Sequence, residues 1–282
     1  MVSARAEINF ERARFKAFLN EIASFVSRSS NELLSFSEVA EKLKIRSQWY
    51  KGLQTVPLDK IVGSLGRYMD FDRAFLPLQS HTKERWKKID ELYERGVPMP
   101  PVKLYKVGDA YFVRDGHHRV SVAKEKGQKF IEAEVIECKV KVPITAELKP
   151  EDLPIKEEYI EFLEQTKLDQ LRPDQRIEFT IPGNYRTLIE HISVHRYFMG
   201  LEQGHEIPWE EAVISWYDDL YLPVVEAIRK QGIIEHFPGR TEADLYIWLI
   251  THWHYLKEKY GPEIKIEEAA SDFTKRFIKR SG

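Results

Sequence analysis

The sequence contains a single cysteine, Cys138, so no disulfide can form within one chain. A chain without disulfides is typical of a reducing compartment, and we therefore expect a cytoplasmic protein. Cys138 lies in the strand-like run 132–142, where a packed thiol is more common than a reactive one.

Long apolar runs are also missing, and no stretch approaches the ~20 residues that a membrane span requires. The first residues are interrupted by Glu7, Glu11 and Arg12 and do not predict a signal peptide. The net charge is only −2 and the pI is about 6.5, so no global basic field attracts DNA or an anionic membrane. We therefore expect no membrane partner, and DNA binding would need a local basic patch.

What the sequence does contain is a composition suited to a folded core. Apolar residues make up 43% of the 282 residues and charged residues 31%, which is typical of globular proteins. This length accommodates one large domain or two modest ones.

Two helices are predicted near the N-terminus. Residues 8–25 carry apolar side chains at close to helical spacing. Ser35 stands three residues before Glu38 as a capping box, which predicts a second helix over 36–43.

Residues 37–45 resemble the first half of a helix-turn-helix. Trp49, Gly52 and Pro57 follow where the recognition helix would stand, so DNA reading by this segment is not favoured. The remaining candidates for a basic patch are Lys124, Lys126, Lys129, Lys139 and Lys141.

The pattern in the middle of the chain predicts short strands and turns around one helix, 83–95, with Thr82 as its cap. The predicted strands are 56–62, 102–107, 110–114 and 130–142. Beyond Pro143 the pattern becomes helical, and Pro223 must kink or split one helix. The predicted helices there are 157–165, 185–200, 209–231, 241–260 and 267–280.

The most informative segment is 111–123, in which a short apolar strand turns through Asp115-Gly116 into a helix that starts with His117, His118 and Arg119. The first turn of a helix leaves backbone N–H groups unpaired at the positive end of the helix dipole, which favours phosphate. An arginine there can hold a phosphate with two hydrogen bonds. The alternative is a plain strand–turn–helix with a solvated basic tip.

Each residue of this turn has a candidate role in phosphate chemistry. The N–H groups of Gly116, His117 and His118 would face the anion, Arg119 would clamp it, and Ser121 would add a hydroxyl. Asp115 is the candidate Mg²⁺ ligand or general base. His117 or His118 is the candidate proton donor. The alternatives are a turn carboxylate for Asp115 and packed or surface imidazoles for the histidines.

Two further groups are candidate sites. Arg67, Asp70, Asp72 and Arg73 place two cations and two carboxylates within seven residues, suited to phosphates and a metal, or to surface pairing. His191 and His195 stand four residues apart on one helix face, which suits two metal ligands, although no third ligand with proper spacing is visible.

Residues 55–145 resemble the ParB/sulfiredoxin superfamily, through the run 56–61, the loop ending at Arg67 and the signature Asp115-Gly116-His117-His118-Arg119. ParB proteins carry Gly-Glu/His-Arg-Arg at the signature, sulfiredoxins Gly-Gly-Cys-His-Arg, and archaeal free-serine kinases the same Asp-Gly-His-His-Arg. The resemblance implies that this turn holds nucleotide phosphates. Segments 195–198 and 237–246 resemble an uncharacterised helical domain found beside kinase-like domains.

Departures from these relatives limit the resemblance. His117 stands where sulfiredoxins need a cysteine, so that chemistry is not expected. The serine kinases carry a catalytic glutamate in the loop after the first strand, where this chain has no acid in 62–65. The helix-turn-helix reader that follows this domain in chromosome-segregation ParB proteins is also missing from the pattern.

We therefore expect an α+β protein in three parts: a helical arm (1–50), a small ParB/sulfiredoxin-like mixed-sheet domain (51–145) and an all-α domain (146–282). The expected function is binding of a nucleoside di- or triphosphate with Mg²⁺, for phosphoryl transfer, for hydrolysis or as a switch. The alternatives are a ParB-like DNA-binding protein, nuclease or transcriptional regulator, and an interaction protein without either ligand.

Overall fold

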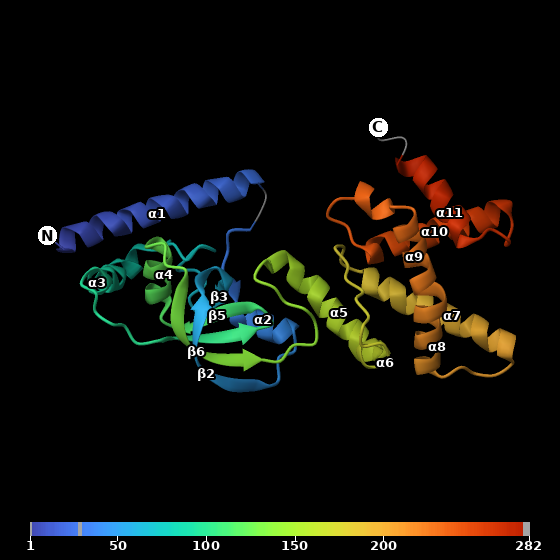
Figure 1. Cartoon of the computed structure of the whole chain (residues 1–282), viewed down its shortest axis with the longest axis horizontal. Coiled ribbons are helices and arrows are strands. Elements are labelled where there is room, and N and C mark those ends of the chain that lie inside the picture. The colour runs from blue at the N-terminus through green and yellow to red at the C-terminus, as the bar shows by residue number, and fades with distance from the viewer. Residues whose placement is uncertain (1, 28–29, 279–282) are drawn as a thin grey trace. The chain divides into compact units, whose positions relative to one another are not determined.

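The structure is a computed structural model that describes residues 2–27 and 30–278. It is an α+β protein that divides into two compact units, residues 1–153 and 154–282 (Figure 1). The first unit contains the sheet, and the second is helical.

Six strands form one mixed sheet in the order β1-β3-β5-β4-β6-β2. Neighbours pair in parallel for β1/β3, β3/β5 and β4/β6, and antiparallel for β4/β5 and β2/β6. The strands are β1 (Leu34–Ser35), β2 (Gln48–Pro57), β3 (Ile61–Ser64), β4 (Val102–Val107), β5 (Ala110–Asp115) and β6 (Phe130–Cys138). Cys138 ends β6 as a buried thiol, as predicted.

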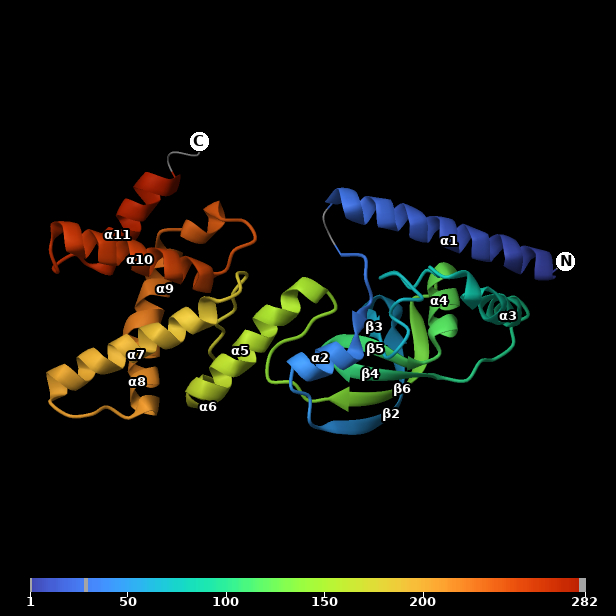
Figure 2. The same cartoon turned by 180° about the vertical axis from the view of Figure 1, so that it is seen from behind.

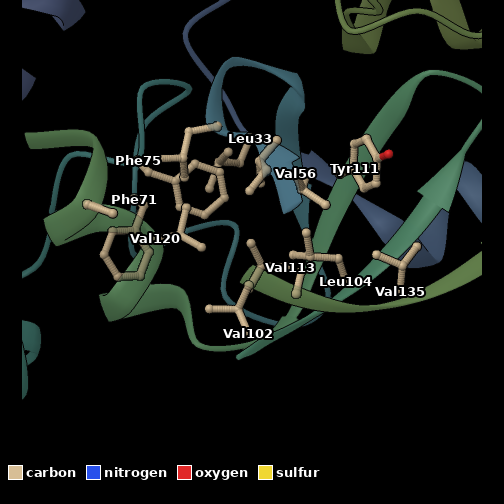
Figure 3. Close-up of a cluster of buried hydrophobic side chains, with 14 residues drawn as sticks. Leu33, Val56, Phe71, Phe75, Val102, Leu104, Tyr111, Val113, Val120 and Val135 are labelled. Carbon is tan, nitrogen blue, oxygen red and sulfur yellow. The ribbon is translucent and has the colours of Figure 1, made fainter. Parts of the chain in front are cut away.

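The two faces of the sheet are covered by different helices because strand side chains alternate in direction. On one face, Phe36 of α2 (Phe36–Lys42) stacks on Tyr105 at 4.1 Å between ring centroids. On the other face, Val120 of α4 (His117–Glu125) packs into the main apolar cluster with Val113 and Phe71 (Figure 3).

Two longer helices extend this packing. α1 (Val2–Ser27) packs against α3 (Lys83–Glu94), and α3 packs against α4 (Figure 2). Phe10 of α1, Trp86 of α3 and Val122 of α4 share a second apolar cluster. α3 is thereby fixed beside the N-terminal half of α4.

The second unit is built from helices with an aromatic interior, in which Tyr246 contacts Trp216 and Tyr221. Among the residues described, no helix is long and apolar enough to cross a membrane. The helices are α5 (Leu153–Thr166), α6 (Leu168–Leu171), α7 (Asn184–Gln203), α8 (Trp209–Ser215), α9 (Leu222–Lys230), α10 (Glu242–Tyr260) and α11 (Ile266–Phe273).

Several sequence predictions are confirmed. Strand β4 lies where expected, Ser35 accepts the N–H of Glu38 at the start of α2, and helix α10 matches the expected 241–260, with Thr241 as its N-cap rather than its first residue. Helix α2 is followed by strand β2 rather than by a recognition helix. The predicted helix 267–280 begins one residue earlier, and its last two residues lie outside the described part of the chain.

Other predictions need correction. The strand expected over 56–62 is two strands, β2 and β3, joined by the short turn Leu58–Lys60. The sequence pattern missed most of β2 because this edge strand is largely exposed, so its residues need not alternate strictly. Thr82 does not cap α3, because its hydroxyl donates back to the carbonyl of Gln79. By contrast, the helix expected over 209–231 is divided near Pro223, as predicted: a π-helical segment, Trp216–Tyr221, separates α8 from α9, and Pro223 lies in the first turn of α9.

Candidate functional site: a basic cleft at the start of helix α4

The site lies where two parallel neighbouring strands end. β3 ends at Ser64 and β5 ends at Asp115, so their carboxyl ends meet at one edge of the sheet. Gly116 then reverses the chain at a φ of 99°, and α4 begins at His117. A Cβ on Gly116 would lie 2.6 Å from Cγ1 of Val102, so only glycine fits this turn. The strand–turn–helix predicted from the sequence is confirmed.

A cleft of about 410 Å³ opens in front of this turn. This volume is in the range of small-molecule sites, roughly 300–1,000 Å³. The loop after β3, one side of α3 and the β5–α4 turn form its walls. Its lining residues are Leu65, Gly66, Arg67, Arg85, Ile89, Arg114, Asp115, Gly116, His117, His118 and Arg119.

The lining has four arginines against one carboxylate. Asp115 is paired with Arg119 at 2.8 Å, and the guanidinium of Arg114 lies over the Tyr105 ring, 5.8 Å from its centroid. Arg67 and Arg85 remain as the cations in excess. Arg67 is 3.3 Å from Asp70, just outside the cleft, whereas Arg85 is exposed and has no carboxylate partner among the described residues. The cleft is therefore electropositive, in a chain whose net charge is −2.

His117 is buried, with its Nε2 2.7 Å from the hydroxyl oxygen of Ser64. Burial lowers its pKa to about 4, and the charge of Arg67 acts in the same direction. The imidazole is thus neutral at pH 7. Because Ser64 is fully buried at the end of β3, this pair fixes the ring in place.

His118 is also buried, but its Nδ1 has no hydrogen-bond partner. Burial lowers its pKa to about 4, and the charges of Arg67 and Arg85 contribute. The ring meets Phe71 edge-on, at 5.5 Å between centroids. An unsatisfied buried polar atom is costly, and this one belongs to a residue that lines the cleft, so a ligand that reaches it would supply the missing partner.

The guanidinium of Arg119 is already hydrogen-bonded within the protein. Its Nη1 donates to the carbonyl oxygens of Pro100 and Pro101, and its Nη2 donates to Asp115. The guanidinium thereby ties the loop before β4 to the start of α4. Most of its donors are occupied, and Arg67 and Arg85 are the better-placed cations for a ligand.

The sequence analysis did not identify Arg85 or Arg114 as site residues. Arg85 reaches the cleft because its neighbour Trp86 anchors α3, donating from Nε1 to the Ser121 hydroxyl at 2.9 Å. That long-range contact has no local sequence signal. Ser121, predicted to add a hydroxyl to the site, is instead buried between α3 and α4 and does not line the cleft.

The predicted group of two arginines and two acids is divided by the fold. Only Arg67 lines the cleft, with Asp70 beside it. Asp72 is buried, accepts from Asn20 and from the Leu76 N–H, and has its pKa raised by burial. Arg73 donates to the carbonyls of residues 146 and 148. These two residues hold loops in place.

The predicted histidine pair of the second unit is satisfied within the fold. His191 Nδ1 lies 3.2 Å from the Tyr246 hydroxyl, and His195 Nε2 lies 3.0 Å from the Ser215 hydroxyl. Within the described part of the chain, no three His, Cys, Asp or Glu side chains gather as metal ligands. A metal at His191 and His195 therefore lacks a third protein ligand of these types.

The lysines considered as a DNA patch do not all point to solvent. Lys124 donates to the Ile61 carbonyl and lies over the Phe75 ring, and Lys126 pairs with Asp90. Burial lowers the pKa of Lys124 to about 8.

Comparisons with known proteins add little to this geometry. No protein-family model matches the chain, and no curated protein matches it. A search of solved structures finds a structure described as the C2221 form of a Pnob8-like ParB-N domain. The identity is 12%, the match covers 84% of each chain, and the TM-score is 0.23.

Proposed function

We propose that the cleft at the start of α4 binds the phosphate groups of a nucleoside di- or triphosphate. The observation that carries this proposal is the convergence of Arg67 and Arg85 on a helix N-terminus beside the unpartnered Nδ1 of His118. The guanidinium groups attract a polyanion, and Nδ1 of His118 donates to a phosphate oxygen when it carries a proton. The resemblance of the 115–119 signature to phosphate-holding turns points the same way.

The finer proposal is Mg²⁺-dependent phosphoryl transfer or hydrolysis. Mg²⁺ keeps several waters and needs only one or two carboxylates besides the phosphates, and Asp115 and Asp70 are the acids nearest the arginines. Catalysis of this kind is mainly positioning and charge neutralisation, which Arg67 and Arg85 would supply. Asp115, exposed at the mouth, is the candidate base toward an incoming hydroxyl.

The test of binding is titration calorimetry with ATP, CTP, GTP and inorganic triphosphate, each with Mg²⁺ and with EDTA. Arg85→Ala is the informative variant because this side chain is exposed and has no carboxylate partner in the described structure. Arg46→Ala is the matched control, because Arg46 is exposed but does not line the cleft. Binding that is lost in Arg85→Ala and kept in Arg46→Ala is the expected result.

Two results would contradict the proposal. One is the absence of heat with every nucleotide and with triphosphate. The other is salt-sensitive binding of duplex DNA that Arg46→Ala and Arg85→Ala weaken equally, since that pattern indicates a diffuse electrostatic surface.

The test of catalysis is phosphate release or transfer by the wild type and by Asp115→Asn. We expect turnover to fall more than affinity in the variant. Equal turnover in both proteins would show that Asp115 takes no part in catalysis and serves only to pair with Arg119.

A further inference from the structure

Helix α1 has two apolar faces, and only one of them is packed. Phe10, Ala13 and Ala17 are buried against the Trp86 cluster. The opposite face carries a second apolar row, which we call the outer stripe, and all of its members are exposed. The outer stripe consists of Ile8, Phe15, Phe18, Leu19, Ile22, Phe25 and Val26.

The spacing of the outer stripe is that of a helix–helix seam. Ile8, Phe15 and Ile22 are seven residues apart, Phe18 and Phe25 repeat at the same interval, and the two series are offset by three. This is the pattern of the two core positions of a heptad repeat. The described helix is continuous over the whole stripe.

The exposed area is larger than a monomer normally tolerates. Phe25 is 86% exposed, Phe15 60% and Phe18 55%. With aromatic side chains of roughly 150–250 Å² each, the stripe leaves about 800 Å² open to water. The largest apolar patch on a typical monomer is about 300–600 Å².

The cations of α1 beside the stripe already have partners within the chain. Arg12 and Lys16 share Glu125, Arg14 donates to the Leu78 carbonyl, and Lys83 of α3 pairs with Glu11. An amphipathic helix that binds an anionic membrane presents free cations beside its apolar face. The flanks of α1 lack that feature, so the stripe is better suited to a protein surface that is apolar itself.

We propose that the outer stripe is a dimer interface, covered by the outer stripe of a second copy of this chain. An identical stripe has the same length, spacing and apolar character, as a two-fold symmetric contact requires. About 800 Å² from each copy matches the standard size of a stable interface, about 1,600 Å² in total. The same helix packs on α3, which carries Arg85, so the dimer would hold two clefts in one assembly.

The test is sedimentation velocity of the full chain over a concentration series. The wild type should form dimers, and Phe15→Glu/Phe18→Glu should raise the dimer dissociation constant by roughly 100-fold or more, because buried interface aromatics carry much of the binding energy. Leu201→Glu is the matched control, an exposed apolar residue of α7 in the second unit. It should leave the dimer intact.

A second variant keeps the test decisive if the double substitution disturbs folding. Phe25→Glu changes the most exposed member of the stripe and leaves the packed face of α1 untouched. Circular dichroism should show wild-type helix content, and the dimer should again weaken. A wild type that stays monomeric at every concentration would overturn the proposal, as would a dimer that persists in both variants. Binding of monomers to phosphatidylglycerol vesicles would assign the stripe to a membrane instead.

Discussion

The two units differ in how they hold their candidate histidines: His117 and His118 of the first unit are buried, whereas His191 and His195 of the second are half-buried. Burial lowers the pKa of His117 and His118 in the first unit and of His191 and His195 in the second. In the second unit, each imidazole meets a hydroxyl from a neighbouring helix.

In the first unit, His117 has such a partner but His118 Nδ1 has none, and cations surround it. A pKa lowered by burial therefore does not distinguish a histidine that only supports the fold from one that can contact a ligand. An unsatisfied ring nitrogen beside excess positive charge does distinguish the two, and four experiments test that distinction.

The largest effect, a loss of stability, is expected from Gly116→Ala, which changes the turn that precedes both histidines. The new Cβ would overlap Val102, and the φ of 99° is strained for alanine. We expect a loss of about 2–4 kcal/mol in the free energy of unfolding, measured by urea denaturation. Gly127→Ala is the control, because Gly127 also has positive φ but open space around it. If both variants lose the same amount, the close approach at Gly116 carries no special cost.

Next in size is the loss of a cleft arginine. Arg67→Ala should weaken triphosphate binding by about 1.5–3 kcal/mol, the range for hydrogen bonds to charged groups. Calorimetry measures this directly. His195→Ala, which changes a satisfied site of the second unit, should leave the affinity unchanged. A larger effect from His195→Ala would reverse our assignment of the two regions.

A change of pH is expected to have a smaller effect on the affinity for phosphate. A bound phosphate neutralises the field of Arg67 and Arg85 and favours the imidazolium of His118, so binding raises its pKa from about 4 and takes up a proton. Affinity should therefore rise as pH falls toward about 4, by up to tenfold per pH unit between the pKa of His118 in the complex and its pKa in the free protein. Calorimetry in buffers of different ionisation enthalpy measures the proton uptake.

His118→Gln separates this effect from titration of the phosphate itself, because both proteins bind the same ligand. We expect the variant to lose the extra pH dependence. An identical pH profile in the variant and the wild type would show that His118 does not meet the ligand.

The smallest effect is expected in the second unit. His195→Ala removes one hydrogen bond to Ser215 and should cost about 1 kcal/mol of stability in urea denaturation. Zn²⁺ should not raise the melting temperature of the wild type. A Zn²⁺-dependent rise that disappears in His195→Ala would restore the metal hypothesis for His191 and His195.

Local signals in the sequence were enough for much of the fold. The Asp115-Gly116 turn, the Ser35 cap and the strand 102–107 are each defined by neighbouring residues, and each was predicted. Strand β2 was missed because an exposed edge strand depends on its partner β6 more than on its own apolar pattern.

The candidate site was only partly predictable for the same reason. The signature turn is local, but Arg85 arrives from a helix some thirty residues earlier and is positioned by the Trp86–Ser121 contact. Asp72 and Arg73 looked like ligands because charge density in a loop does not reveal which side chains will be buried against other loops.

The lone cysteine has a practical consequence. Cys138 is 2% exposed, and burial raises its pKa to about 11, so a maleimide will scarcely react with it in the native protein. A cysteine introduced on the surface would be the preferred site for a dye, with the native residue kept. A fluorophore attached beside the cleft or on the outer face of α1 could then report ligand arrival or subunit exchange from a known position.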